Sequence, residues 1–242
     1  MRSSVPDVSK KYLELYQAAK IPLSTPIAYM LTKHIDGVQF LTRENVFILK
    51  RFQSITFIPE EKGLIGFYVD TDAIITKQKI SLGVAVGDCS VIVATAVDRK
   101  DSKRFVIFVH SGFSGAILNV VGKAIDAAHT QYQFDNSDLV CAIYPSISGK
   151  NYKRGLSYLE EIQKAGLDFR SEFLIPVSET EAGFDFQAKI VSDLKDKGVE
   201  VINVSGLDTY EENRNRNLYS LTYAKENNLS LDNRFLVCVS LG

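Results

Sequence analysis

The sequence predicts one α/β domain with a mixed sheet, and three observations support this. Segments rich in Val and Ile interleave along the chain with segments whose apolar residues recur at helical spacing. No internal repeat or low-complexity linker interrupts the 242 residues. Hydrophobic residues make up 45% and charged residues 24%, which excludes collagen, coiled coils and general disorder. We therefore expect residues 1–242 to form a single domain.

The first part of the chain predicts a helix followed by several strands. Residues 7–20 carry an apolar stripe at helical spacing, start near Asp7 or Ser9 as a capping residue, and stop before Pro22. The β-rich segments that follow are residues 45–58, 63–69, 73–76, 81–86 and 90–97. A charged turn then leads into a strand at residues 105–109, which ends at His110.

After His110 the pattern becomes helical. Residues 111–115 contain two glycines, and apolar residues recur with a helical period over residues 116–129. The other expected elements are strands at 139–144, 199–204 and 235–240, and helices at 155–165 and 186–197. Residues 211–217, rich in charged residues and Asn, are expected to form a solvated loop.

Charge and apolar content argue against several partners and locations. The net charge is −1, from 28 Lys and Arg against 29 Asp and Glu, so neither nucleic acid nor an anionic membrane is an expected partner. The most apolar stretch, residues 80–97, contains Asp88 and is too interrupted to span a membrane. No signal peptide is visible, and three scattered cysteines give no disulfide framework. We expect a cytoplasmic protein.

Cys89 and His110 are the residues most suggestive of chemistry. Because consecutive strands tend to be neighbours, both side chains are expected at one edge of a sheet. The glycines after His110 let a ligand approach the backbone, and the following helix directs its N-terminus at the same place. A thiolate and an imidazole can hold zinc or copper, or act as nucleophile and base. A packed Cys and a solvated His are the alternatives.

Four short motifs in register resemble the laccase-domain family. They are DAIIT at residues 72–76, VAVGDC at 84–89, HSGFSG at 110–115 and YPSISGKNYKRG at 144–155. Members of that family carry the labels multicopper polyphenol oxidase, peptidoglycan editing factor and purine nucleoside phosphorylase. The resemblance runs from about Phe52 to the C-terminus and is poor over residues 1–45.

The resemblance implies an α/β/β/α sandwich with mixed sheets and a metal site built from one Cys and two His, with zinc common and copper claimed for some members. Cys89 and His110 match two of these ligands, whereas Gln53 stands where the other His is expected and is a weaker ligand for zinc. His34 and Asp88 are conceivable replacements. The implied activities are phosphorolysis of purine nucleosides with phosphate, and adenosine deamination.

The candidate site residues combine this resemblance with position in the chain. The catalytic candidates are Cys89, His110 and Asp88, the metal ligands are Cys89 and His110, and the substrate-binding candidates are Gly112, Ser114, Gly115 and Gln53. The family's Trp-Arg pair is Phe113-Ser114 here, and its terminal double Arg is Thr222-Tyr223, so cations suited to phosphate are missing.

Two alternative functions stay open at this point. One is a family member that binds a ligand or partner without catalysis. The other is a metal-free cysteine hydrolase or deamidase, similar to the catalytic domain of cytotoxic necrotising toxins, in which the thiol pKa of Cys89 is depressed and His110 acts as its base. The sequence does not predict an oligomeric state.

Overall fold

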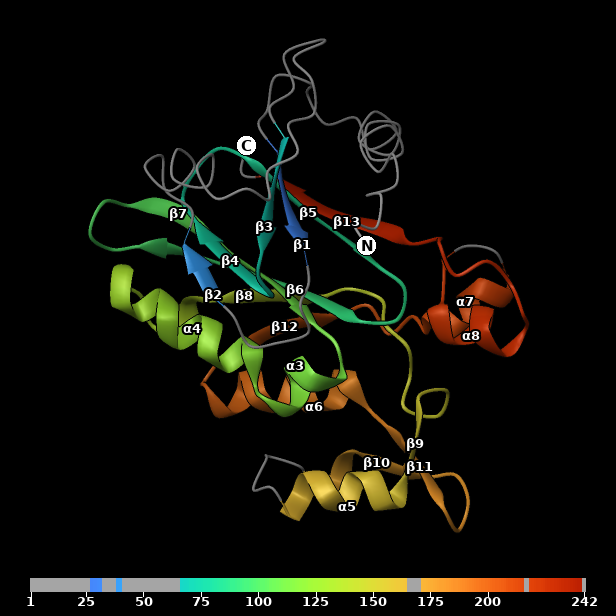
Figure 1. Cartoon of the computed structure of the whole chain (residues 1–242). Coiled ribbons are helices and arrows are strands. Elements are labelled where there is room, and N and C mark those ends of the chain that lie inside the picture. Colours follow the sequence, from blue (N-terminus) through green and yellow to red (C-terminus); the bar gives the residue numbers. More distant parts are fainter. Residues whose placement is uncertain (1–26, 32–37, 41–65, 165–170, 216–217, 241–242) are drawn as a thin grey trace.

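The computed structural model describes residues 27–31, 38–40, 66–164, 171–215 and 218–240 (Figure 1). The strands are β1 (Ile27–Leu31), β2 (Val38–Phe40), β3 (Gly66–Asp70), β4 (Ala73–Thr76), β5 (Ser81–Val86), β6 (Ser90–Asp98), β7 (Lys103–Ser111), β8 (Val140–Ile143), β9 (Lys153–Gly155), β10 (Leu174–Pro176), β11 (Glu181–Phe184), β12 (Val201–Val204) and β13 (Phe235–Ser240). The helices are α3 (Phe113–Ile117), α4 (Val120–Gln131), α5 (Leu156–Lys164), α6 (Phe186–Asp196), α7 (Thr209–Arg214) and α8 (Leu221–Glu226), with 3-10 turns at Asn136–Asp138 and Ser171–Phe173.

Two mixed sheets form the centre of the fold. The larger sheet has the strand order β12-β8-β6-β7-β4-β2, and the smaller has the order β13-β5-β1-β3. The pair β6–β7 is antiparallel with nine residues of each strand in register, whereas β8–β12 and β2–β4 are parallel. The α/β class with mixed sheets is therefore confirmed.

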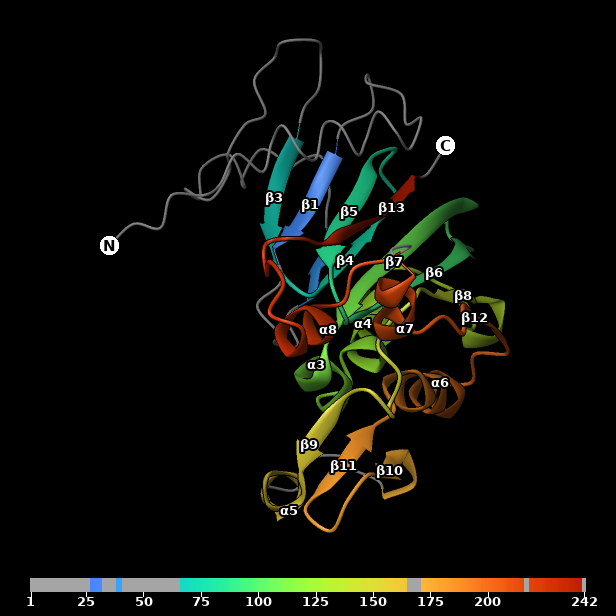
Figure 2. The same cartoon turned by 90° about the vertical axis from the view of Figure 1, so that its right-hand side faces the viewer.

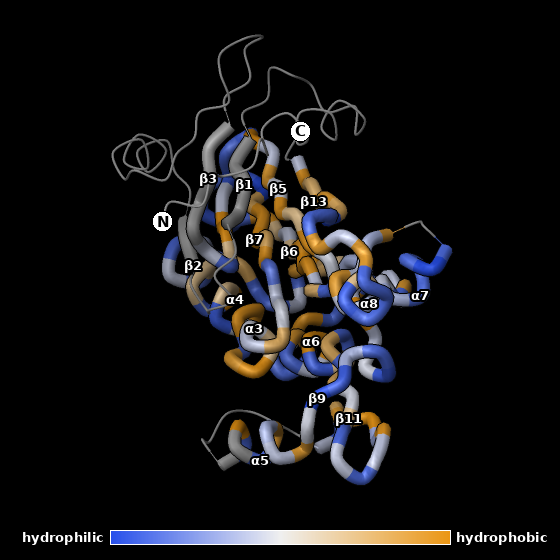
Figure 3. The backbone as a smooth tube through the Cα atoms, turned by 45° about the vertical axis from the view of Figure 1, so that its right-hand side comes forward, coloured by the Kyte–Doolittle hydropathy of each residue, from blue (hydrophilic) through white to orange (hydrophobic). Residues whose placement is uncertain are grey.

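Alternation along the strands builds a core on each face of the larger sheet. In β7, Val106 and Phe108 belong to the cluster shared with Leu82 of the smaller sheet, while Ile107 and Val109 belong to the cluster that contains α4 and α6. Figure 2 shows the two sheets stacked, with α4 and α6 against the outer face of the larger one. Hydrophobic residues concentrate along β5, β6 and β7 in the interior (Figure 3).

Most predicted strands agree with the structure, and some expectations fall outside it. The strands expected at 73–76 and 81–86 are β4 and β5, and the strand expected at 63–69 overlaps β3. The helix expected at 7–20 and the β-rich segment at 45–58 lie outside the described residues. Among the described residues, none of the helices has the length and apolar character that crossing a membrane requires.

The prediction of one helix over residues 116–129 is wrong. Two helices occupy this region, α3 and α4, and they are separated at Asn119. Asn119 adopts a left-handed conformation with φ of 52°, and its side chain accepts a hydrogen bond from the backbone N–H of Gly122 at 2.9 Å. Asn tolerates this conformation and is a strong N-cap, so a new helix begins here although the apolar period continues.

The solvated loop expected at residues 211–217 is also partly wrong, because α7 covers Thr209–Arg214. Asp208 caps this helix, and Ser220 caps α8 by accepting a hydrogen bond from the N–H of Tyr223 at 3.1 Å. Both helices have six residues, too few for an apolar period to reveal them. The third sheet, β10-β11-β9, was likewise not predicted, and it projects with α5 beyond α6 (Figure 2).

Candidate functional site

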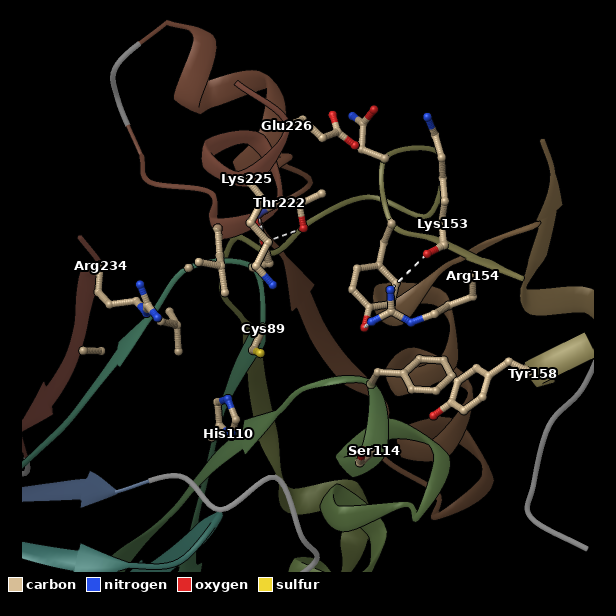
Figure 4. Close-up of a pocket in the computed structure, with 18 of the residues that line it drawn as sticks. Cys89, His110, Ser114, Lys153, Arg154, Tyr158, Thr222, Lys225, Glu226 and Arg234 are labelled. Carbon is tan, nitrogen blue, oxygen red and sulfur yellow. Dashed lines mark hydrogen bonds between the residues drawn. The ribbon is translucent and has the colours of Figure 1, made fainter. Parts of the chain in front are cut away.

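The pairing of β6 with β7 brings Cys89 and His110 together. Val91 lies opposite His110 in the register, and Cys89 lies in the turn just before β6, two residues before Val91, so Cys89 and His110 lie at the same end of this strand pair. Both line a cavity of about 710 Å³ (Figure 4). His110 is only 2% exposed, and Cys89 is partly exposed. The geometry thus provides one shared concave site for the two residues.

Asp72 holds the His110 ring. Oδ1 of Asp72 lies 2.8 Å from Nδ1 of His110, and the His110 backbone N–H donates to the Asp72 carbonyl at 2.8 Å. Both side chains are buried, so the ring orientation is fixed and Nε2 is the nitrogen on the edge away from Asp72. A carboxylate behind a histidine supports both metal-ligating and proton-transferring imidazoles. Asp72 opens the DAIIT motif at residues 72–76, and its position just before β4, whose Ala73 pairs with Val109, places it beside His110.

The Cys89 thiol is not a poised nucleophile in this environment. Burial, together with the negative charges of Asp88 and Asp72, raises the pKa of the Cys89 thiol to about 12, against a lowering by Arg234. The depressed thiol pKa expected for a metal-free cysteine enzyme is therefore wrong, because the neighbouring carboxylates and the loss of water both favour the neutral thiol. A metal ion bound to the sulfur removes its proton outright.

Asp88 connects the turn between β5 and β6 to α7 and α8. Its Oδ1 accepts a hydrogen bond from the Thr209 hydroxyl at 3.0 Å, and its Oδ2 accepts from the N–H and the hydroxyl of Thr222, both at 2.7 Å. The side chain lines the cavity but is only 9% exposed. Three hydrogen bonds occupy the two oxygens, which favours a positioning role over the predicted catalytic role or a role as metal ligand.

Of the predicted substrate-binding residues that the structure describes, one lines the cavity and two do not. Ser114, in α3, is exposed and lines the cavity. Gly112 is the N-cap of α3 and lies outside the described lining, and Gly115 packs so closely that an added Cβ would lie 3.2 Å from Val120. Gln53 lies outside the described residues, as does His34. Substrate binding by these residues stays a prediction.

One side of the cavity carries cations from two elements. Lys225 extends from α8, and Arg234 precedes β13 (Figure 4). Arg234 donates to the backbone carbonyl oxygen of Leu231 at 2.7 Å, and within the described part of the chain neither cation forms an ion pair. Neither Arg234 nor Lys225 was a site candidate from the sequence. Glu226 also lines this side, where its carboxylate accepts from the Tyr210 hydroxyl.

Aromatic side chains form the opposite side. The Phe113 ring centroid lies 5.9 Å from that of Tyr152 and 6.0 Å from that of Tyr158. The Arg154 guanidinium lies over the Tyr152 ring, 3.9 Å from its centroid. Figure 4 shows Arg154 and Tyr158 across the cavity from Arg234, with Cys89 and His110 between the two sides. Sequence reasoning missed this wall, because its residues come from a loop, β9 and α5.

The described residues supply only part of a metal site. Cys89 and His110 are donors of the types that zinc and copper accept, and Asp72 supports the imidazole as an outer partner. A catalytic zinc site has three protein ligands, and over the described ranges no group of three His, Cys, Asp or Glu side chains is arranged to hold a metal. The donor set within these ranges is one ligand short.

Comparison with known proteins agrees with the fold and the motifs. Residues 4–228 match the profile of the family described as multi-copper polyphenol oxidoreductase laccase. The chain belongs to this family. The match within this laccase family begins at residue 4, so it includes the N-terminal segment in which no motif was visible.

Curated relatives and solved structures show that this laccase-family chain is divergent. It is 21% identical over 171 residues to a protein of Rickettsia conorii named purine nucleoside phosphorylase, covering 71% of this chain and 68% of the relative. A protein of Mycobacterium bovis with the same name is 29% identical over 142 residues, which are 56% of this chain and 51% of that protein.

The solved structures share the fold at low identity. The hypothetical protein YfiH of Bacillus licheniformis superposes with a TM-score of 0.73 at 18% identity, covering 97% of this chain and 81% of that one. YlmD of Geobacillus stearothermophilus gives a TM-score of 0.72 at 18% identity, covering 97% and 80%.

Proposed function

We propose that this chain catalyses the phosphorolysis of purine nucleosides in the Cys89–His110 cavity. The observation that carries the proposal is that Cys89, just before β6, and His110, in the neighbouring strand β7, line one cavity of about 710 Å³. That volume lies in the range of small-molecule sites. The relatives named purine nucleoside phosphorylase support a purine nucleoside and phosphate as the substrates.

The reaction assigns a task to each side of the cavity. A phosphate oxygen forms a bond to C1′ of the ribose while the C1′–N9 bond breaks, and the departing purine takes up a proton that the attacking dihydrogen phosphate carried. The charges of Lys225 and Arg234 attract and orient the phosphate. The carboxylate of Asp72 accepts the proton at Nδ1 of His110, so Nε2 carries a lone pair, with which it can bind a metal ion or accept a proton from the reacting groups.

Cys89 and His110 are also the residues we propose as metal ligands, with zinc, or else copper, as the ion. Such an ion, when bound, supplies a Lewis acid beside the reacting groups. The third ligand would come from outside the described ranges, where His34 and Gln53 are the candidates. Elemental analysis of protein purified without added metal tests this part, with Cys89→Ala and His110→Gln as variants that lose the ion and Cys238→Ala as a matched control that keeps it.

A nucleoside panel tests the activity. Adenosine, inosine and guanosine are incubated with the protein, with and without phosphate and with and without added zinc or copper, and released base and ammonia are measured. The expected result is base release that requires phosphate and is lost in Cys89→Ala but kept in Cys238→Ala. Release of ammonia from adenosine without release of the base would indicate deamination instead of phosphorolysis. Inactivity with every nucleoside under every metal condition would refute the proposal.

The two alternatives give different results in the same experiments. A metal-free cysteine hydrolase would keep its activity after treatment with a chelator, which the raised pKa of Cys89 argues against. A non-catalytic binding protein would show no turnover, and Cys89→Ala and His110→Gln would change its stability alone.

A further inference from the structure

We propose that Arg154, Tyr152 and Tyr158 form a stacking wall that binds the planar base of the substrate. The identity of that base as a purine rests on the proposed function, whereas the wall itself rests on contacts that are independent of it. None of the three residues was a candidate from the sequence.

The wall is supported from behind by buried aromatic rings. The Phe113 ring, 9% exposed, has its centroid 5.1 Å from that of Phe184, in an edge-to-face arrangement, and Phe186 lies 4.6 Å from Tyr152 between centroids. Phe184 and Phe186 are both buried. Such a cluster fixes the positions of the cavity-lining rings, so that a ligand meets a preformed surface.

The Arg154 guanidinium is held over the Tyr152 ring. Its carbon lies 3.9 Å from the ring centroid, one terminal nitrogen donates to the carbonyl oxygen of Lys153 at 3.0 Å, and the other donates to the Tyr152 hydroxyl. The side chain lines the cavity, and its guanidinium carbon also lies 5.5 Å from the centroid of the Phe113 ring, so the part of the guanidinium that these two rings leave open faces a ligand in the cavity. No carboxylate in the described ranges pairs with this cation. A fixed planar cation of this kind stacks well on an aromatic base.

Tyr158 presents a large ring to the cavity. It lies in the first turn of α5, is 47% exposed, and has its ring centroid 6.0 Å from that of Phe113. Together with Arg154 it gives the side of the cavity opposite Arg234 a stacking character (Figure 4). A ligand that has a planar base at one end and an anion at the other would place its sugar between the sides, above Cys89 and His110. A purine offers more stacking area than a pyrimidine.

Binding of 2-aminopurine riboside, a fluorescent purine nucleoside, tests the wall on the full-length protein. Stacking on one side chain contributes about 1–3 kcal/mol, which corresponds to roughly 5- to 150-fold in Kd. We expect Arg154→Lys, which keeps the charge and loses the plane, and Tyr158→Ala each to raise Kd by such a factor. Tyr158→Phe should rescue binding to within about twofold, since it keeps the ring. Lys150→Ala, at an exposed cation in the neighbouring turn, is the matched control and should leave Kd unchanged.

The outcomes separate the wall from the proposed activity. If the unchanged protein binds the probe, the variants bind it more weakly, and no base is released from nucleosides, the stacking wall is supported and the proposed phosphorolysis is refuted. If phosphorolysis proceeds with the same KM for inosine in Arg154→Lys and Tyr158→Ala, the wall is overturned and the activity stands. Absence of probe binding by the unchanged protein also overturns the wall. Far-UV circular dichroism on each variant checks that it is folded.

Discussion

Replacement of Asp88 distinguishes a positioning carboxylate from a catalytic one. Asp88→Ala removes three hydrogen bonds to an ionised group, which individually contribute about 1.5–3 kcal/mol and add incompletely because they share one side chain. We expect the free energy of unfolding to fall by about 3–5 kcal/mol. Since Thr222 and Lys225 belong to α8, the amide protons of α7 and α8 should exchange faster and activity should fall together with this loss of order.

Asp88→Asn is the informative partner of that variant. Its amide oxygen can accept both bonds from Thr222, and its NH₂ group can donate to the Thr209 hydroxyl, which reverses its role. The expected loss of stability is therefore only about 1 kcal/mol, with activity within about tenfold of the original protein. A catalytic carboxylate would instead lose roughly 100-fold or more on the same substitution.

The assays are urea denaturation, hydrogen exchange and kcat/KM measured on the same preparations. Thr222→Val serves as the control, because it removes the hydroxyl that donates one of the three hydrogen bonds to Asp88. We expect its free energy of unfolding to fall by about 1 kcal/mol and the amide protons of α8 to exchange faster. An Asp88→Asn protein with unchanged stability and exchange but no activity would refute the positioning role. An Asp88→Ala protein as stable as the original would refute the energetic reasoning.

Three further predictions follow from the charges. Arg234→Gln should raise KM for phosphate about tenfold and leave KM for the nucleoside unchanged, measured by initial rates, because it removes a cation from one side of the cavity only; equal increases in both KM values would contradict this. Burial raises the pKa of Asp98, but hydrogen bonds from Lys77 and from two backbone N–H groups outweigh it and bring the pKa to about 2, below the ordinary 3.8. The carboxyl of Asp98 thus binds its proton less readily in the folded than in the unfolded protein. Its contribution to the stability of the fold is therefore complete above about pH 4 and is lost as the pH falls towards 2. In urea titrations the Asp98→Asn protein should be less stable than the original by about 2 kcal/mol at pH 7, and this difference should disappear near pH 2. In chelator-treated protein, iodoacetamide should label Cys89 slowly at pH 7, and the rate should rise about tenfold for each unit of pH increase up to the raised pKa of about 12. Rapid labelling at neutral pH would contradict a thiol that is buried beside the carboxylates of Asp88 and Asp72.

Local sequence patterns predicted the central strands β4 to β7 because most of their residues are apolar and buried on both faces. Val- and Ile-rich runs such as Ser81–Val86 and Ser90–Asp98 are buried between the sheets or under the helices, and their bounds follow the composition closely. The shared location of Cys89 and His110 was also predictable, because it needs only that the next strand be the neighbouring one. Short elements defined by capping, such as α8, left no comparable pattern.

The parts of the site that sequence reasoning missed depend on contacts between distant segments. Asp88 meets Thr222 across 134 residues, and no local period records which loop an acidic residue will reach. Arg154 and Tyr158 lie on a small sheet and a helix that both line the cavity, so a half-buried cation and an exposed ring acquire a shared face only in three dimensions. The local sequence pattern therefore predicts that Cys89 and His110 meet at the larger sheet, whereas the residues that we propose to bind the ligand come from later segments of the chain. The selective residues of a divergent laccase-family member should be sought in those walls, since the walls can change while the strands that hold Cys89 and His110 stay the same.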